Sequence, residues 1–508
     1  MLPHQIGLGA IAAGNLERGK KAAYEEGRIT AEEMLAANMR WTFSPCGGVA
    51  ENMRWGRSYE CYSENLEIVT ELTLQNVQGL QDNGVGACIK HWIGEGQVQG
   101  DNPNTNQGNR NNNPITRERI MEIAGVYRAA VETWTIMPSY LGLNITGTGS
   151  GTGNYSMHTH KPMMQDYLKD ELGWNGMMIG DYRWHTTPDS VNAGLDCLMA
   201  AERSTDYLRN TERNGILNGC TEKRIDDAVM RMLRFKKRIG LFDNPYLSSP
   251  GQIRKPENVA AARSMAADSM VLLRNKNNFV QDIQGSKFKN IMVAGRASEG
   301  NKGRGYQCGG WTIGWQGSDQ TSDRVTAVTI FEGIDAAKGG GVNVTSSVDG
   351  SEEGAFDLII AVIAEMPYAE SEGDIPNRWS SGGCILGPDM AMLENVYAKK
   401  AANPGTKILV VILSGRPIAF SPQVGTGAAS VQTTKGREFE KWDGLIEAWL
   451  PGDQAGAALA DLLFTNREFA GKTPQPWHEG IDKTGELIYP YGYGLKKSDP
   501  VDMDFHAP

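Results

Sequence analysis

The feature that most constrains the fold is an alternation of helix-like and strand-like segments over residues 24–244. Helix-like segments occur at Tyr24 to Ala37, Leu66 to Asn83, Ile115 to Thr133 and Pro162 to Leu172. Short apolar strand-like segments follow them at Trp41 to Pro45, Gly86 to Trp92, Thr135 to Pro138 and Gly176 to Asp181. Strands that alternate with helices are typical of parallel βαβ units. The sequence therefore predicts an α/β protein whose first domain is (β/α) barrel-like.

A second α/β domain is indicated after a Pro- and Ser-containing stretch, Tyr246 to Lys255. The clearest helix of the chain, Thr221 to Gly240, precedes this stretch. Continuous apolar runs, which suit strands buried on both faces, occur at Ile291 to Ala294, Leu358 to Ala364 and Ile408 to Leu413. A helical stretch is expected at Leu445 to Trp449. We predict a barrel-like domain over 1–245, a linker over 246–258, an α/β sandwich over 259–470 and an irregular tail over 471–508.

Composition excludes several classes of protein. The chain has 508 residues, of which 22% are charged, and a formal net charge of -10 without a Lys/Arg cluster. These values disfavour a nucleic-acid partner. The longest apolar runs are too short to span a membrane. Seven cysteines without a CxxC pair do not form a disulfide scaffold, and the opening MLPHQIGLGAIAAG does not resemble a signal peptide.

Metal and phosphate motifs are weak. His158-Thr159-His160 has no apparent third ligand, and we expect no metal. Gly7-x-Gly9-x-x-Ala12 lacks a preceding strand, and the GTGSGTG run from Gly147 lacks the Lys of a phosphate-binding loop. Both are interpreted as ordinary glycine-rich turns. We therefore expect no cofactor.

A carboxylate with aromatic neighbours is the stronger signal. Asp181 ends an apolar strand and is followed by Tyr182 and Trp184. The carboxyl ends of barrel strands carry active sites, and carboxylates walled by aromatic rings suit glycoside chemistry. Trp311 and Trp315 lie in the glycine-rich segment CGGWTIGW. This pair could clamp a sugar or pack under its loop.

The chain resembles glycoside hydrolase family three, in its two-domain β-glucosidase and exo-β-glucanase branch. The segments that carry the resemblance are IGLGA, YEEGRITAEEM, RWGRSYECYSEN, KHWIGEG, GMMIGDY, NAGLD, RIDDAVMRMLRFKKRIGLFDNP, ARSMAADSMVLLRNK, QCGGWTIGWQG, LSGRP, AWLPG and YGYGL. The resemblance implies a barrel followed by an α/β sandwich, in agreement with the alternation. It also implies hydrolysis of β-linked glucosides or gluco-oligosaccharides by an exo-acting, retaining enzyme.

The resemblance assigns roles to individual residues. Asp181 would be the nucleophile. Residues that would hold the terminal sugar are Arg57 of RWGR and Lys90 and His91 of KHW. Trp311 and Trp315 would clamp the neighbouring sugar, while Tyr182 stands where the family generally has Trp.

The acid/base position departs from the family. After AWLPG the family usually has x-Glu-Gly, and the resemblance makes that Glu the acid/base; here Asp453-Gln454 follows Gly452. An amide cannot donate a proton, so Gln454 would weaken catalysis. Asp453 is a candidate substitute acid. Glu438 and Glu440 are more distant alternatives, which could equally be solvated surface charges.

The amino end also departs from the family, whose first barrel strands precede the segment that matches IGLGA. We therefore expect an incomplete first domain whose open edges recruit a partner or an oligomer. Family members are commonly periplasmic or secreted. Three interpretations follow: an active β-glucosidase-type hydrolase, a catalytically impaired homologue that binds glucan or is structural, and an incomplete chain of an active family.

Overall fold

The chain folds into two compact units, each described by itself. The computed structural model describes residues 1–97, 113–146, 155–182, 187–199, 219–247, 251–285, 287–312, 314–318, 325–375, 383–422, 437–481, 483 and 485–499. We call Ala23–Val49 with Leu66–Lys255 the barrel-like unit, and Met1–Ala22, Ala50–Asn65 and Pro256–Pro508 the sandwich unit. Two segments from the first 65 residues thus lie in the sandwich unit. The domain boundaries given above stay a prediction.

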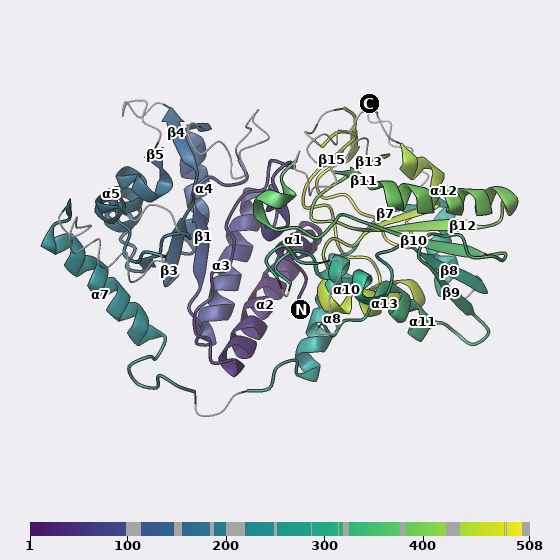
Figure 1. The fold of residues 1–508 in the computed structure, drawn as a ribbon, viewed down its shortest axis with the longest axis horizontal. Helices are drawn as coiled ribbons and strands as arrows, with labels where there is room; N and C mark the ends of the chain where they lie inside the picture. The colour runs from purple at the N-terminus through teal and green to yellow at the C-terminus, as the bar shows by residue number, and fades with distance from the viewer. Residues whose placement is uncertain are drawn as a thin grey trace. The chain divides into compact units, whose positions relative to one another are not determined.

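The barrel-like unit is built on parallel strands in the order β1-β3-β6. Isolated parallel bridges extend this sheet. On one side Trp41 pairs with Gly86 and Cys46 pairs with Lys90, and on the other side Ile179 pairs with Cys197. Helix α2 (Leu16–Ala36) begins in residues of the sandwich unit and continues in the barrel-like unit. The other elements of the barrel-like unit are α3 (Leu66–Asp82), β1 (Cys88–Trp92), β2 (Asn113–Thr116), α4 (Arg117–Ala129), β3 (Thr135–Pro138), β4 (Gly142–Thr146), β5 (Tyr155–Ser156), η2 (Met157–Thr159), η3 (Pro162–Glu171), β6 (Met177–Met178), α5 (Pro188–Asn192) and α7 (Glu222–Arg238) (Figure 1). The predicted barrel-like α/β architecture is confirmed.

Local sequence explains where these elements begin and end. The Thr221 side chain caps α7 by accepting the Arg224 backbone N–H, and Gly240 takes a left-handed φ of 75° after the helix ends. Phe235 and Ile239 from this end of the helix pack with Cys88 and Met177 of the sheet. The helix predicted over 115–133 is wrong at its start, because Ile115 pairs with β4 as part of strand β2 and the helix begins at Arg117.

The sandwich unit has a six-stranded sheet in the order β7-β14-β12-β10-β8-β9, in which only the β7–β14 pair is antiparallel. Its elements are α1 (Gln5–Gly14), η1 (Ser58–Glu60), α8 (Pro256–Ser269), β7 (Val271–Asn275), η5 (Lys276–Asn278), α9 (Phe279–Gln284), β8 (Asn290–Ala294), α10 (Gly300–Cys308), α11 (Ile330–Ala337), β9 (Asn343–Ser347), β10 (Leu358–Ala364), η6 (Glu370–Gly373), β11 (Cys384–Ile385), α12 (Gly387–Ala402), β12 (Lys407–Leu413), β13 (Ala419–Pro422), η8 (Glu438–Lys441), β14 (Gly444–Glu447), η9 (Gly452–Gln454), α13 (Ala455–Phe464), β15 (Trp477–His478) and β16 (Leu487–Tyr489).

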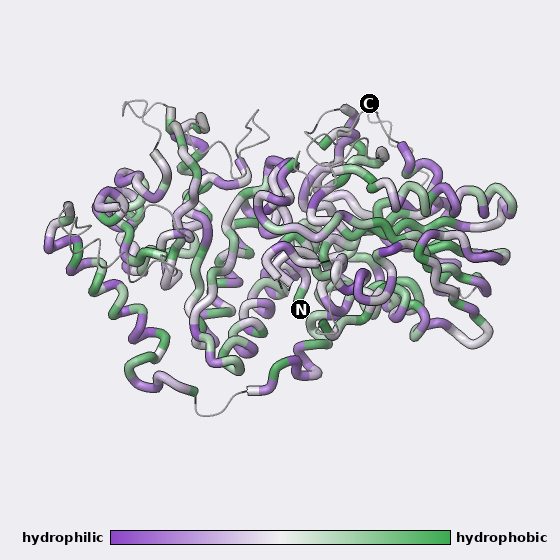
Figure 2. Tube along the Cα trace, in the orientation of Figure 1, coloured by the Kyte–Doolittle hydropathy of each residue, from purple (hydrophilic) through white to green (hydrophobic). Residues whose placement is uncertain are grey.

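The continuous apolar runs are the central strands of this sheet. Alternate residues of β10 join opposite cores: Ile359 packs with α12, and Ile360 packs with α11 and α13. Figure 1 shows these helices on opposite faces of the sheet, and Figure 2 shows β10 and β12 as its most hydrophobic part. Burial on both faces explains why these runs do not alternate with polar residues.

Two sequence interpretations are corrected in this unit. The glycines Gly7 and Gly9 lie in helix α1, not in a turn, and a Cβ at Gly9 would lie 1.6 Å from the Tyr62 carbonyl oxygen. Close helix packing therefore explains the glycine. The segment predicted as helix at Leu445 to Trp449 begins as strand β14, paired with β12 and β7. Its short apolar run has no helical periodicity to distinguish it from a buried strand.

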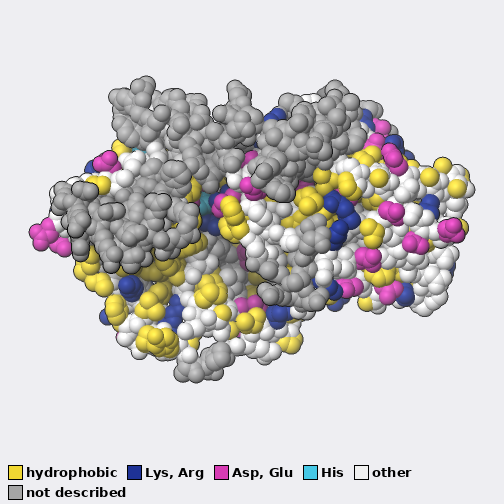
Figure 3. Space-filling model, viewed as in Figure 1, with side chains coloured by type: hydrophobic (Ala, Val, Ile, Leu, Met, Phe, Trp, Pro, Cys, Tyr) yellow, Lys and Arg dark blue, Asp and Glu magenta, His cyan; other side chains and the backbone are white. Residues whose placement is uncertain are grey.

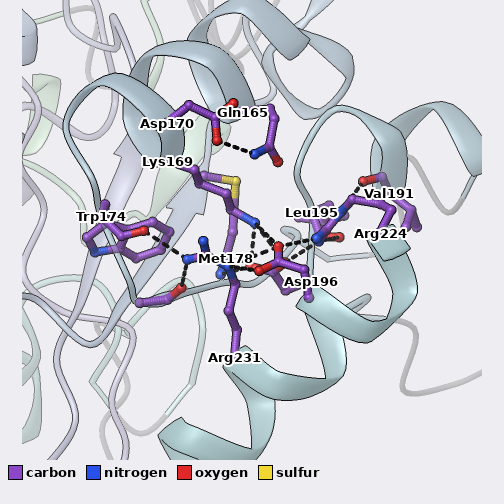
Figure 4. A network of polar contacts seen from close by, with 12 residues as sticks. Gln165, Lys169, Asp170, Trp174, Met178, Val191, Leu195, Asp196, Arg224 and Arg231 are labelled. Carbon is purple, nitrogen blue, oxygen red and sulfur yellow. Dashed lines mark hydrogen bonds and ion pairs between the residues drawn. The ribbon is translucent and has the colours of Figure 1, made fainter. Parts of the chain in front are cut away.

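A buried charge network holds the strand that leads to Asp181 (Figure 4). The Asp196 carboxylate accepts the Met178 backbone N–H of β6 at 2.8 Å and the Lys169 ammonium at 2.7 Å, and it also pairs with Arg224 of α7. Arg231, also of α7, donates to the carbonyl oxygens of Trp174 and Gly176. Burial lowers the pKa of Lys169 to about 8, although Asp196 favours its charged form.

Replacing Asp196 with Ala is expected to destabilise the protein by about 3–5 kcal/mol, since it leaves Lys169 buried without this partner. Asp166→Ala is the matched control, because Asp166 and Lys161 form an exposed pair for which less than about 1 kcal/mol is expected. Urea unfolding of both variants measures the difference. Equal losses for the two variants would contradict a stabilising role of Asp196.

Candidate active site

The barrel-like unit places the predicted nucleophile at the end of its β6 strand. Asp181 follows Gly180, whose backbone N–H bonds to Cys197, and the Asp181 side chain is 16% exposed. His91 lies in β1, between Lys90 and Trp92. These two neighbours pair with consecutive residues of β3, so the register shifts here and His91 is the extra residue of a bulge. Such a bulge redirects a side chain. It explains why simple alternation does not predict the direction of His91.

The structure brings Asp181 and His91 together: the Nε2 atom of His91 lies 3.5 Å from Oδ2 of Asp181. The Nδ1 atom of His91 contacts the Glu95 carboxylate at 2.6 Å. Glu95 also accepts the Ser139 hydroxyl at 2.9 Å, and the Ser139 carbonyl oxygen lies 3.1 Å from Nδ1 of His158. The Nε2 atom of His158 accepts the Asp181 backbone N–H at 3.0 Å. Sequence reasoning missed Glu95, Ser139 and the polar role of His158.

Tyr182 and Lys90 lie in the same unit. The Tyr182 backbone N–H donates to Oδ1 of Asp181 at 2.6 Å, and the Tyr182 side chain is exposed. Tyr140 donates its hydroxyl to the Tyr182 carbonyl oxygen and stacks on His158 with ring centroids 5.4 Å apart. Lys90 is half-buried in β1. Trp184 and the glycine run from Gly147 lie outside the described residues.

The sandwich unit holds Arg57 and Trp311 around one buried carboxylate. Glu60 accepts two hydrogen bonds from the Arg57 guanidinium, at 3.1 and 2.8 Å. It also accepts the Trp311 indole N–H at 3.1 Å. Trp311 is nevertheless 43% exposed, whereas Arg57 is buried. Through Glu60, an exposed aromatic ring is thus held close to the buried Arg57 guanidinium. Trp315 is 53% exposed, and its carbonyl oxygen accepts the Trp311 backbone N–H.

A carboxyl group that sequence reasoning missed, Glu370, lies beside Arg57. Its Oε1 atom is 3.4 Å from Nη1 of Arg57, and its side chain is 22% exposed. Glu370 has a left-handed φ of 53°, which is uncommon for a residue other than glycine. Its segment follows β10 at the carboxyl end of the strand, which is the signal that also identifies Asp181.

The loop that carries Glu370 is tightly fastened within the sandwich unit. A Cβ at Gly56 would lie 2.0 Å from the Glu370 carbonyl oxygen, so glycine permits this close approach. Arg416, fully buried, donates to Glu365 at 3.1 Å and to the Gly373 carbonyl oxygen at 2.5 Å. Asp374 accepts the Gly56 backbone N–H at 2.7 Å. Glu370 is therefore held next to Arg57 from both ends of its loop.

Burial raises the pKa of Asp374 to about 8, against the opposing influence of Gly56, Arg416 and Arg57. The folded protein then keeps a proton that the unfolded chain loses above about pH 4, so stability falls as pH rises from about 4 to 8. Asp374→Asn should therefore be more stable than the natural protein at pH 8, on the order of 1–3 kcal/mol, and no more stable at pH 4. Unfolding curves at both pH values measure this, and an advantage that is the same at both would contradict it.

The residues predicted at the acid/base position are buried and engaged in the sandwich unit. Oδ2 of Asp453 lies 2.5 Å from the Met1 ammonium. The Gln454 side-chain amide donates to the Asp453 carboxylate at 3.1 Å. The Asp453 carboxylate is buried, and Gln454 has an amide in place of a carboxyl group. That Gln454 replaces an acid/base residue stays a prediction.

The remaining candidates have other partners. Glu438 accepts the Tyr397 hydroxyl at 3.0 Å and pairs with Lys441, while Glu440 pairs with Arg437. These contacts suit surface charges. Within the described ranges, no cluster of three or more His, Cys, Asp or Glu side chains could hold a metal ion. On the face drawn in Figure 3, acidic and basic side chains are interspersed.

The chain matches two family models that together span most of its length. They are Glycosyl hydrolase family 3 N terminal domain over residues 1–235 and Glycosyl hydrolase family 3 C-terminal domain over residues 270–497. The chain belongs to glycoside hydrolase family three, as the motifs predicted.

Relatives with known names support the same family. The lysosomal beta glucosidase of Dictyostelium discoideum is 24% identical over 97% of this chain and 60% of its own length. The periplasmic beta-glucosidase of Salmonella typhimurium is 22% identical over 96% of this chain and 69% of its own length. The crystal structure of an exo-1,3/1,4-beta-glucanase from a Pseudoalteromonas species matches with a TM-score of 0.82 and 28% identity, over 99% of this chain and 61% of that one. The chain thus spans about three fifths of the length of two of these proteins.

None of the helices in the described ranges combines the length and the apolar character that a membrane crossing requires.

Proposed function

We propose that this protein is a retaining, exo-acting glycoside hydrolase that releases β-linked glucose from glucosides or gluco-oligosaccharides. The observation that carries the proposal is the Asp181 carboxylate at a strand end, partly exposed and held by backbone and imidazole contacts. The relatives named as β-glucosidases and as an exo-glucanase support the substrate class.

In the proposed first step, an oxygen of Asp181 bonds to the anomeric carbon while the bond to the leaving oxygen breaks. A carboxylic acid gives its proton to that oxygen. In the second step water attacks the same carbon and gives its proton back to the acid, and the bond to Asp181 breaks. The His91 ring near Oδ2 of Asp181 suits stabilisation of the ionised nucleophile.

We assign the acid role to Glu370 in place of the Gln454 position. Glu370 is a partly exposed carboxyl group beside Arg57, whereas Asp453 and Gln454 are buried and bonded to each other. A retaining mechanism needs a carboxylic acid that protonates the leaving oxygen. Kinetics of a Glu370→Gln variant with leaving groups of different pKa test this assignment.

Arg57, Lys90 and His91 are proposed to hold the terminal sugar, with Tyr182 beside it. The exposed rings of Trp311 and Trp315 are proposed to stack on the next sugar, since sugar C–H faces pack on aromatic rings. A β-glucoside or β-glucan oligosaccharide is the proposed substrate. A periplasmic or secreted location stays a prediction from the family resemblance, and a partner or oligomer stays a prediction from the sequence.

The alternative function is a catalytically impaired homologue that binds glucan, which the exposed tryptophans would support without any acid. Proton NMR of the reaction with an aryl β-glucoside separates the two. An active retaining enzyme gives β-glucose as the first anomer. Binding of gluco-oligosaccharides without hydrolysis would favour the alternative, and α-glucose as the first product would exclude a retaining mechanism.

A further inference from the structure

We propose that His158 is a positioning residue for Asp181, and that Ser139 and Glu95 complete a closed ring of polar contacts around this carboxylate. The inference rests on the proposed function, in which Asp181 is the nucleophile. The ring passes from Asp181 to His91, Glu95, Ser139 and His158 and returns to the Asp181 backbone.

The first arm of the ring fixes the backbone of Asp181. The Ser139 carbonyl oxygen can only accept a hydrogen bond, so the Nδ1 atom of His158 must carry a proton. The Asp181 backbone N–H can only donate, so Nε2 of His158 must be unprotonated. His158 is therefore neutral, in a single tautomer. Its ring, fully buried and stacked on Tyr140, holds the Asp181 backbone at 3.0 Å.

The second arm fixes the carboxylate of Asp181. Glu95 accepts from the Ser139 hydroxyl with Oε1 and contacts Nδ1 of His91 with Oε2. Both oxygens of Glu95 are thus used, and the imidazole of His91 is oriented with Nε2 facing Asp181. The Tyr127 hydroxyl, which donates to the His91 carbonyl oxygen at 2.8 Å, holds the backbone of the same residue.

Ser139 joins the two arms, since its hydroxyl donates to Glu95 and its carbonyl oxygen accepts from Nδ1 of His158. The members of the ring come from four places in the unit. His91 lies in β1 and Glu95 just after it, Ser139 follows β3, His158 lies in η2, and Asp181 follows β6. Its members other than Asp181 are buried, and the Asp181 carboxylate is the part that reaches solvent. A misplacement of about 1 Å can lower a rate by about 10²-fold, so this frame matters for attack on the anomeric carbon.

Two variants of His158 separate positioning from a general contribution to stability. The side-chain oxygen of Gln can replace Nε2 as acceptor of the Asp181 N–H, so His158→Gln keeps the contact to the nucleophile. The amide of Asn can replace Nδ1 as donor to Ser139, so His158→Asn keeps that contact and loses the one to Asp181. Both variants remove one hydrogen bond and the imidazole ring, so a merely structural role predicts similar effects.

The readout is the rate at which 2,4-dinitrophenyl 2-deoxy-2-fluoro-β-glucoside labels Asp181, since this leaving group needs no acid. We expect labelling to be slower by about 10²-fold in His158→Asn and by no more than about tenfold in His158→Gln, at similar melting temperatures. Equal rates in the two folded variants would overturn the proposal. No labelling of the natural protein would instead overturn the proposed function.

Ser139→Ala decides the matter if either His158 variant does not fold, because it removes only the hydroxyl and keeps the carbonyl oxygen for His158. We expect labelling to be slower by about three- to tenfold, mainly from loss of the hydrogen bond to the charged Glu95. The Leu141 backbone N–H, which donates to the same hydroxyl at 3.1 Å, also loses its acceptor. An unchanged labelling rate in this variant would overturn the proposal.

Discussion

Replacing Asp181 with Asn is expected to lower kcat/KM for aryl β-glucosides by about 10⁴-fold or more. The amide is a poor nucleophile and cannot form the covalent intermediate, and removal of a nucleophile in other enzymes has costs of this size. The carboxamide is similar in shape, and its oxygen can still accept the Tyr182 backbone N–H that now reaches Oδ1. Initial rates with a series of aryl β-glucosides measure the loss.

Asp166→Asn is the matched control for this substitution. Asp166 lies on η3 of the same unit, exposed and paired with Lys161, so its activity should stay within about twofold of the natural protein. Activity retained by Asp181→Asn would contradict the nucleophile assignment, provided that deamidation back to Asp is excluded by mass spectrometry.

Replacing Glu370 with Gln is expected to have an effect that depends on the leaving group. For leaving groups of high pKa, loss of the acid should lower kcat/KM by about 10²–10⁴-fold. For dinitrophenolate, which leaves without a proton, the first step should be nearly unaffected. Azide should then restore turnover and give a β-glucosyl azide, because this anion attacks the intermediate without a general base.

Gln454→Glu gives the contrasting result. If Gln454 stood at the acid position, this change would raise turnover of poor leaving groups by orders of magnitude. We expect no such rise, since the Gln454 side chain is buried and bonded to Asp453. A uniform loss in Glu370→Gln for all leaving groups, together with a gain in Gln454→Glu, would contradict our assignment.

The fold was predictable because its strongest signals are local. The alternation of helices and strands, the two-sided apolar runs and the cap residues of α7 all follow from the sequence within short windows. The sequence predicted the wrong secondary structure where tertiary packing determines the conformation. Gly9 serves close packing of α1 against Tyr62, and Leu445 is in a strand because neighbours on both sides pair with it.

The candidate site was predictable only in part. Asp181 could be predicted because it ends an apolar strand. The same rule would have indicated Glu365, directly after Leu358–Ala364, and so the segment that also carries Glu370. The family motif drew attention to Gln454 instead. The roles of Glu95 and His158 depend on contacts across 44 and 23 residues of sequence, to Ser139 and Asp181, which no local pattern reveals.

Covalent trapping tests the central claim most directly. The natural protein is incubated with 2,4-dinitrophenyl 2-deoxy-2-fluoro-β-glucoside, digested and analysed by mass spectrometry. Our account predicts one fluoroglucosyl group per chain, on the peptide that contains Asp181 and on that side chain. Labelling of a different carboxylate, or hydrolysis of β-glucosides with no adduct on Asp181, would contradict it.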